Sequence, residues 1–149
     1  MKQRTISILA AGLLAASMAA GCSSSYKDGT YTAQSSVFEG IEDEEFGEEN
    51  GDGYGEVTIT VKDNKIVDCQ FTTYMTDGTV KGADYGKQDG AIANQDYYNK
   101  AQRAVQASQN YADQLKAKGD LKEVDAISGA TISYNEFNEA VKLALKQAK

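Results

Sequence analysis

The chain has 149 residues, with 15 lysines and arginines against 22 aspartates and glutamates, no histidine and a formal net charge of −7. The lack of histidine excludes the imidazole general base, the Ser–His and Cys–His nucleophile pairs, and histidine-ligated zinc or haem. The acidic balance argues against nucleic acid as a partner, because nucleic-acid binding rests on neutralising phosphates with basic side chains.

The first 21 residues have the pattern of a secretory signal peptide. Lys2 and Arg4 form a basic start, and an apolar run follows them. The run is too short to span a membrane comfortably, because polar residues begin at position 23. We therefore expect the signal to be removed and the remaining chain to work outside the cytoplasmic membrane.

The signal ends in the letters MAAGC, which resemble the lipobox of bacterial lipoproteins, with Cys22 as the acylated residue. The pattern departs from a lipobox at Ala19, where leucine is usual, and a plain signal peptide is the alternative. Two or more acyl chains, such as palmitate, would give stable anchoring to the cell membrane. We expect three parts: a signal peptide over 1–21, a lipidated tether over 22–27 and one folded domain over 28–149.

The first part of the domain alternates between strand and acidic patterns. Residues 28–37 predict a turn and a strand, and residues 39–52 predict a solvated loop, because they are acidic and rich in glycine. The loop partly matches a calcium-binding EF-hand around Asp52, but the closing carboxylate of that template would fall on Ile59. We reject an EF-hand here and leave weak cation binding open.

Residues 55–74 predict a β-hairpin turned by the letters KDNK. Alternating apolar residues give each strand one buried face, with Val57, Ile59 and Val61 on the first strand and Val67, Cys69 and Phe71 on the second. If Cys22 carries lipid, Cys69 has no disulfide partner, and we expect it to be a small buried hydrophobic residue.

A long segment, 75–94, follows the hairpin and contains four glycines. Such a segment could close over a ligand, and a disordered excursion is the alternative. The helical spacing of Tyr97, Ala101, Ala104, Ser108, Ala112 and Leu115, widened by Val105 and Tyr111, predicts a helix over 95–118, ended by Gly119. The letters DLKEV after it predict a short strand or an extended link.

A second helix is expected over 134–146, with Phe137, Ala140, Val141, Ala144 and Leu145 on its buried face. Ser133 and Glu136 have the spacing of a capping box, and Ile132 and Phe137 have that of a hydrophobic staple. This assignment places Thr131 just outside the helix, with its hydroxyl in front of the unpaired N–H groups of the first turn. Helix N-termini attract phosphate, although the segment could also be a simple helix entry.

The letters DAISGAT, residues 125–131, resemble the flavinylation motif Asp-x-x-Ser-Gly-Ala-Thr of the FMN-binding domain family. The family includes the C subunit of the sodium-translocating NADH:quinone oxidoreductase, the G subunit of the Rnf complex and flavin-bearing surface lipoproteins of extracellular electron transfer. The resemblance runs from about Asp28 to the C-terminus, through DGTY, GEVTITVKDNKIVDCQF, YADQL and NEAVKLALKQA.

In that family, an FMN transferase uses FAD and magnesium to attach FMN through a phosphodiester to the motif threonine. The resemblance assigns this role to Thr131, with Asp125 as a recognition or loop-fixing residue and Ser128, Gly129 and Ala130 shaping the phosphate loop. Tyr85, Tyr74 and Tyr134 are the candidate neighbours of the flavin ring. Lys81 and Lys87 are the candidate cations for the phosphate.

Together these features predict an α+β fold: a small, mostly antiparallel sheet with two packed helices and the flavin loop at the N-terminus of the last helix. The expected function is that of an electron carrier with covalent FMN, not of an enzyme. It would take electrons from a membrane-bound donor and pass them to an extracellular acceptor. The alternative is a lipoprotein that binds FMN or another small ligand reversibly, as a scavenger or sensor.

Overall fold

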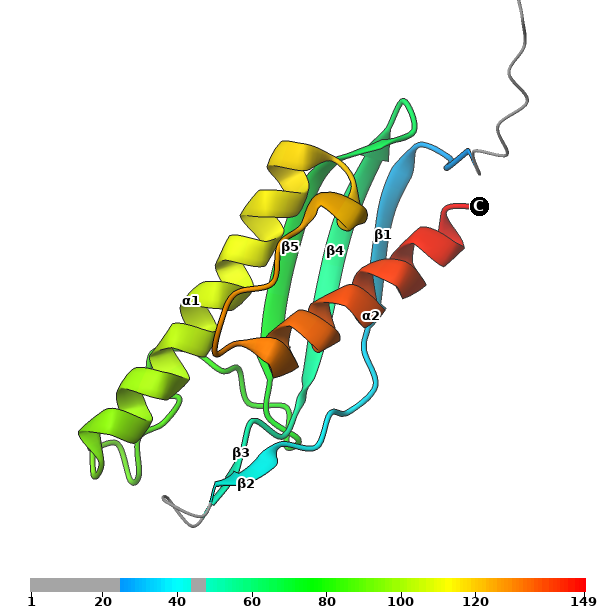
Figure 1. Cartoon of the computed structure of the whole chain (residues 1–149). Coiled ribbons are helices and arrows are strands. Elements are labelled where there is room, and N and C mark those ends of the chain that lie inside the picture. Colours follow the sequence, from blue (N-terminus) through cyan, green and yellow to red (C-terminus); the bar gives the residue numbers. More distant parts are fainter. Residues whose placement is uncertain (1–24, 44–47) are drawn as a thin grey trace, which may run out of the picture.

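The computed structural model describes residues 25–43 and 48–149, which form a three-stranded antiparallel sheet, a pair of short strands and two helices (Figure 1). The sheet has the strand order β1–β4–β5, and β2 pairs with β3 in a separate two-stranded sheet. In chain order the elements are β1 (Gly29–Gln34), β2 (Ile41–Asp43), β3 (Glu48–Asn50), β4 (Tyr54–Lys62), β5 (Lys65–Tyr74), α1 (Gln95–Lys118), the 3₁₀ helix η1 (Leu121–Glu123) and α2 (Thr131–Gln147). The expected α+β fold is confirmed.

Both helices cover the same face of the sheet (Figure 1). Helix α1 packs along β5, and α2 crosses β4 and β1. The outward face is polar, and on it the hydroxyls of Thr30 and Thr32 hydrogen-bond those of Thr60 and Thr58 at 3.1 and 2.9 Å. A sheet with one covered face shows this alternation of buried and exposed positions, so the core lies in one layer between sheet and helices.

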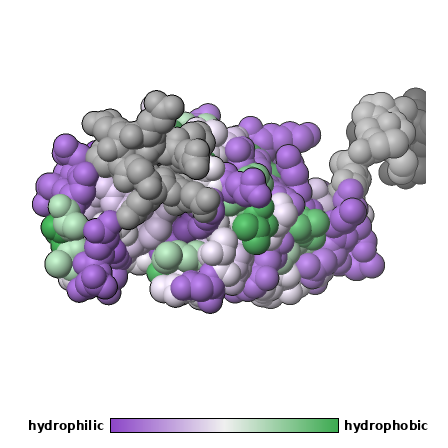
Figure 2. Space-filling view, turned by 90° about the horizontal axis from the view of Figure 1, so that it is seen from below, coloured by the Kyte–Doolittle hydropathy of each residue, from purple (hydrophilic) through white to green (hydrophobic). Residues whose placement is uncertain are grey.

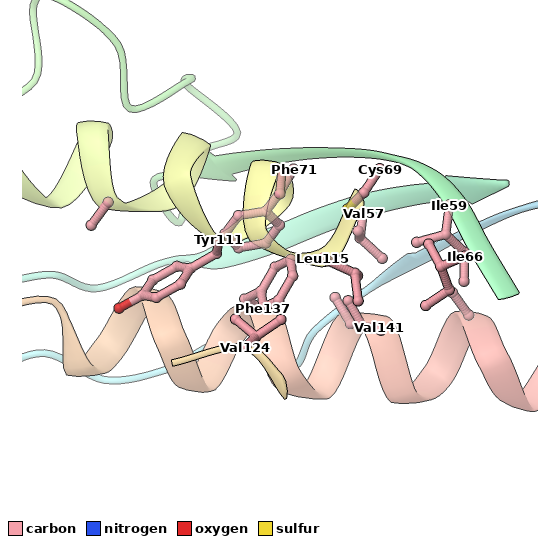
Figure 3. Packing of buried hydrophobic residues seen from close by; sticks show 14 of the residues in the cluster. Val57, Ile59, Ile66, Cys69, Phe71, Tyr111, Leu115, Val124, Phe137 and Val141 are labelled. Atoms are coloured by element: carbon pink, nitrogen blue, oxygen red, sulfur yellow. The ribbon is translucent and has the colours of Figure 1, made fainter. Parts of the chain in front are cut away.

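Aromatic side chains at the centre of the core join the two helices to the sheet (Figure 3). Phe137 of α2 meets Phe71 of β5 edge-on, with ring centroids 5.0 Å apart. It also stacks with Tyr111 of α1 at 5.7 Å. Burial of one large apolar side chain contributes about 1.5–3 kcal/mol, so this cluster fixes the start of α2 against both neighbours.

The hairpin of β4 and β5 is confirmed, but the prediction that Val67 is buried is wrong. Thr60 pairs with Asp68 and Val61 pairs with Ile66, so an irregularity in the register leaves Val67 without a partner on β4. Ile66 is buried in its place, and Val67 is 44% exposed. A bulge of one residue reverses which side chains face the core, and alternation in the sequence alone cannot locate it.

Beyond the bulge the predicted alternation of β5 is correct, and Cys69 and Phe71 are buried. Cys69 is a free cysteine. Burial raises the pKa of its thiol to about 12, helped by the nearby charges of Asp68 and Asp113. The expectation of a buried, unreactive Cys69 therefore has a physical basis in the fold.

Helix α1 has the predicted bounds. The side chain of Asn94 caps its start by accepting the backbone N–H groups of Asp96 and Tyr97, and Gly119 ends it with a φ of 76°. The predicted stripe is buried at Ala101, Ser108, Tyr111, Ala112 and Leu115, whereas Tyr97, Ala104 and Val105 are half-buried. The next segment forms the 3₁₀ helix η1 and not the expected strand or extended link.

The structure bears only partly on the predictions for the acidic and N-terminal segments. The acidic segment contains the paired strands β2 and β3, which the loop prediction missed, while residues 44–47 lie outside the described residues. The signal peptide and Cys22 also lie outside them. Within the described ranges, no helix has the length and apolar character needed to cross a membrane.

The start and the end of the described domain lie side by side at one end of the sheet (Figure 1). The backbone N–H of Lys27 donates to Ala148 O at 2.6 Å, and Lys27 Nζ donates to Lys149 O at 2.9 Å. The first turn of α2 lies at the far end of that helix. The length of α2 therefore separates Lys27 and Lys149 from the segment 125–131 that the sequence singled out.

Candidate functional site

Helix α2 begins at Thr131, three residues earlier than the sequence predicted. The N-cap is Ala130, and no side chain caps the helix. The predicted capping box is wrong: Ser133 is buried within the helix, and Glu136 lies near Lys81 in the interior. The predicted staple is wrong as well, because Ile132 lies inside the helix against Gly51. Tertiary packing of this buried face overrides the local capping signal.

Thr131 is the first residue of α2, not a residue outside it, and its side chain is exposed. The first intrahelical bond runs from the Tyr134 N–H to Ala130 O at 3.0 Å. The preceding N–H groups belong to the first turn, which receives no side-chain cap. An exposed hydroxyl thus sits at the positive end of a 17-residue helix, where an anion would be stabilised.

The bend before the helix is open to an approaching group. Gly129 has a φ of 80°, which favours glycine, and a Cβ built on it would meet nothing within 4 Å. Ser128 is exposed, and Ala130 is buried. These features fit a phosphate at Thr131, because N–H donors without a side-chain cap are present and the space beside Gly129 is open.

Side chains of α1 hold the Asp125–Ala130 segment in place. The Tyr111 hydroxyl accepts the Ile127 N–H at 3.0 Å and donates to Ala130 O at 3.3 Å. Gln114 Oε1 accepts the Asp125 N–H at 2.8 Å. The sequence assigned Tyr111 only to the apolar stripe and gave Gln114 no role, because a helical pattern does not reveal which polar tips reach a neighbouring loop.

Asp125 projects its carboxylate outward from this segment. Its side chain is 86% exposed and pairs with Lys118 Nζ at 3.0 Å. An exposed ion pair contributes at most about 1 kcal/mol. The arrangement is compatible with both predicted roles of Asp125, since the backbone bond fixes the loop and the carboxylate remains accessible.

The three predicted ring neighbours lie on three different parts of the fold: α2, β5 and the segment before α1. Tyr134 packs against Tyr111 with ring centroids 5.4 Å apart, and its hydroxyl donates to Val124 O at 3.3 Å, so it lies beside the motif segment. Tyr74, the last residue of β5, stacks with Tyr54, the first residue of β4, with ring centroids 5.1 Å apart. Tyr85 belongs to a cluster around Lys81, described next.

The segment between Tyr74 and α1 folds back onto the start of β4. The Lys81 ammonium lies 5.4 Å from the centroid of the Tyr85 ring and 3.8 Å from Glu136 Oε1, and it donates to Gly51 O at 3.0 Å. Burial raises the pKa of Tyr85 to about 12, and its hydroxyl is hydrogen-bonded with the backbone of Gly51. The sequence did not reveal this cluster, because its members are far apart along the chain. Lys81 was expected at the phosphate, Tyr85 at the flavin ring and Glu136 in a capping box.

Neither predicted phosphate cation stands free at Thr131. Lys81 is 7% exposed and directed into the interior cluster. Lys87 pairs with Asp84 at 2.8 Å, and that carboxylate raises the pKa of Lys87. Stabilisation of a phosphate would therefore come mainly from the N–H groups of α2.

A groove runs along the exposed face of α2 next to the strand connection after β1. It encloses about 360 Å³ and is lined by Phe38, Asn135, Asn138, Glu139, Lys142 and Leu143. Asn135 and Asn138 follow Thr131 by four and seven residues, so all three share one face of the helix. Viewed from below, the surface is mainly hydrophilic and its hydrophobic residues lie in separate spots (Figure 2).

No group of three or more His, Cys, Asp or Glu side chains in the described part of the chain could hold a metal ion. This statement does not extend to residues 44–47 of the acidic segment, for which weak cation binding was left open.

The chain is similar to known proteins in sequence and in fold. A family model described as FMN-binding domain matches residues 50–146. A crystal structure of a Clostridium perfringens protein shares the fold, with a TM-score of 0.55 and 21% identity over 83% of this chain and 88% of that chain. A solution structure of a Clostridium thermocellum protein is 27% identical over 83% and 92%, with a TM-score of 0.42. A search of curated proteins gave no match.

Proposed function

Because the chain belongs to the FMN-binding domain family, we propose that it carries electrons outside the cytoplasmic membrane through an FMN attached by a phosphodiester to Thr131. The observation that carries this proposal is the exposed Thr131 hydroxyl at the uncapped N-terminus of α2, behind an open glycine bend. When bound, FMN supplies the redox chemistry, and the protein supplies binding and orientation.

The residues of the chain would divide this work. The Thr131 hydroxyl provides the attachment oxygen, and the first N–H groups of α2 stabilise the phosphate charge. Ser128, Gly129 and Ala130 shape the bend, while Asp125 fixes the loop or is recognised by the FMN transferase. Tyr85 and Tyr134 remain the proposed ring neighbours: Tyr134 lies beside the motif, and Tyr85 is linked through Gly51 to Ile132, the residue after Thr131.

The N-terminal part of the chain would place this carrier at the membrane. We propose a signal peptide over 1–21, lipid on Cys22 and a tether over 22–27 ahead of the domain at 28–149. The partners would be an FMN transferase, a membrane-bound electron donor and an extracellular acceptor, without nucleic acid. Covalent attachment suits such a place, because a dissociable cofactor would be lost by dilution.

The test is flavin fluorescence on a denaturing gel after co-expression with an FMN transferase. The wild type should show a fluorescent band that survives boiling in detergent. Thr131→Ala should lose the band entirely, and Thr131→Ser should keep part of it, because only a hydroxyl can accept the phosphate. Thr76→Ala, an exposed threonine outside the motif, is the matched control and should label fully.

Two outcomes would reject the proposal in different ways. A band of undiminished brightness in Thr131→Ala would place the attachment elsewhere. A folded wild type with no band, together with tight binding of free FMN in calorimetry, would favour the reversible scavenger or sensor.

A further inference from the structure

A buried lysine–glutamate pair lies between the Met75–Asn94 segment and α2. Lys81 is 7% exposed and Glu136 is fully buried. Both carboxylate oxygens of Glu136 lack a hydrogen-bond partner within the described residues. Such a pair is costly to bury, and apolar side chains of similar size are often at least as stable. Packing alone therefore does not account for the two charged residues.

The contacts of Lys81 tie together segments that surround the start of α2. Its backbone N–H donates to Thr73 O at 2.8 Å, and its Nζ donates to Gly51 O at 3.0 Å. Gly51 in turn packs on Ile132, since a Cβ on this glycine would lie 2.8 Å from Ile132 Cδ1. One line of contacts thus runs from the long segment, through Gly51, to the residue next to Thr131.

We propose that Lys81 and Glu136 form a proton-linked positioning pair, which fastens the Met75–Asn94 segment and Gly51 to the first turns of α2 and loosens when Glu136 gives up its proton. The inference rests on the proposed function only where it relates the contact between this segment and α2 to a flavin at Thr131. The fastening itself is a property of the chain without flavin, so the two proposals can fail separately.

The direction of the effect follows from the burial of Glu136. Desolvation raises the pKa of its carboxyl from 4.5 to about 7, although the Lys81 charge acts the other way. Opening of the segment would return the carboxyl to water, where it ionises readily. The closed form binds this proton more tightly than the open form does, so opening is favoured as the pH rises. The equilibrium constant for opening should increase at least tenfold between pH 5 and pH 8.

The other titratable groups around the pair are Lys81, Asp52, Tyr85 and Tyr97. Burial lowers the pKa of the Lys81 ammonium, although the charges of Glu136 and Asp52 act the other way. Tyr85 lies over Lys81, with Tyr97 beside it, and the pKa of Tyr85 is about 12. Tyr85 therefore stays neutral across the range from pH 5 to pH 8, and the Glu136→Gln variant separates the contribution of Glu136 from that of Lys81.

The experiment is amide hydrogen exchange of the full chain, flavin-free and flavin-loaded, between pH 5 and pH 8. Protection factors of peptides covering 75–94 are corrected for the intrinsic pH dependence of exchange. Wild-type protection should fall at least tenfold over this range. Glu136→Gln should remove the slope, and Asp84→Asn, which deletes an exposed ion pair on the same segment, should keep the wild-type slope.

A second variant guards against loss of folding in Glu136→Gln. The double replacement Lys81→Met with Glu136→Met substitutes unbranched apolar side chains of similar length, and it should be folded, protected and insensitive to pH. A wild type without a slope, or a slope that persists in either Glu136 variant, would overturn the inference. Gel fluorescence at Thr131 would be unaffected by that result.

Discussion

Gly53 lies at the start of β4, where no side chain fits. Its φ is +153°, and a Cβ would come within 1.9 Å of Tyr74 O and 2.8 Å of Lys81 Nζ. Gly53→Ala should therefore lower the free energy of unfolding by about 2–4 kcal/mol, because backbone and side chain must both shift. Urea denaturation measures the change.

Gly82→Ala is the matched control for this prediction. A Cβ on Gly82 would meet nothing within 4 Å, so the free energy of unfolding should change by less than about 0.5 kcal/mol. Equal losses in the two variants would show that glycine matters here through backbone flexibility and not through the close contact at Gly53.

At the scale of single residues, the motif could be predicted from the sequence, but the residues that hold it in place could not. Thr131, Ser128 and Gly129 follow one another in a recognisable spacing, so they could be named in advance. Tyr111 and Lys81 act through contacts with residues 16 or more positions away. Such contacts depend on how α1 and the long segment pack, and no local pattern encodes them.

Helix α1 depends on a side-chain cap that α2 lacks. Asn94 Oδ1 accepts the N–H groups of Asp96 and Tyr97 at 3.0 and 3.1 Å. Asn94→Ala should cost about 1 kcal/mol of stability, whereas Asn94→Asp should keep most of it, because a carboxylate caps equally well. Thermal melting of both variants checks this. Equal losses in the two would mean that the amide group, not the cap, is what matters.

The two helices also differ in how well their bounds could be predicted, because α1 has a side-chain cap at its start and α2 does not. The start and end of α1 carry local signals, Asn94 and Gly119, and local hydrogen bonds use them. The start of α2 carried a capping signal at Ser133, but burial of Ser133, Glu136 and Phe137 extends the helix past it. Where tertiary burial competes with a local cap, the sequence pattern gives the wrong boundary.

On the scale of the whole molecule, the buried Glu136 makes stability depend on pH. Its pKa in the fold is about 7 against an ordinary 4.5. The folded chain therefore holds this proton more tightly than the unfolded chain does. The stabilisation is complete below about pH 4.5 and is lost as the pH rises to about 7, by about 3 kcal/mol in all.

Denaturation of the wild type and of Glu136→Gln across pH 4.5 to 8 measures this term. The other carboxylates titrate in both proteins, so the difference between the two stability curves isolates Glu136. The free energy of unfolding of Glu136→Gln should increase relative to that of the wild type as the pH rises. Parallel curves would contradict the assigned pKa and would mean that water reaches the carboxyl in the folded protein.

The proposed lipid on Cys22 predicts where the whole protein is found. Cys22→Ser should move it from the membrane fraction to the soluble fraction, because no acyl chain can then be attached. Cys69→Ala removes the only other cysteine and should leave membrane association unchanged. Cell fractionation followed by detergent phase partitioning measures both. A Cys22→Ser protein that remains with the membrane would point to anchoring by another part of the chain.

The contact between Lys27 and the C-terminal end of α2 gives the proposed carrier an orientation. The six residues of the proposed tether reach at most about 20 Å from the lipid. The 17 residues of α2 place Thr131 about 25 Å further along that helix. If the domain stands upright on its tether, the flavin therefore faces away from the bilayer. A donor at the membrane surface could reach it only by projecting outward itself or when the domain leans over, so tether length would set the frequency of reduction.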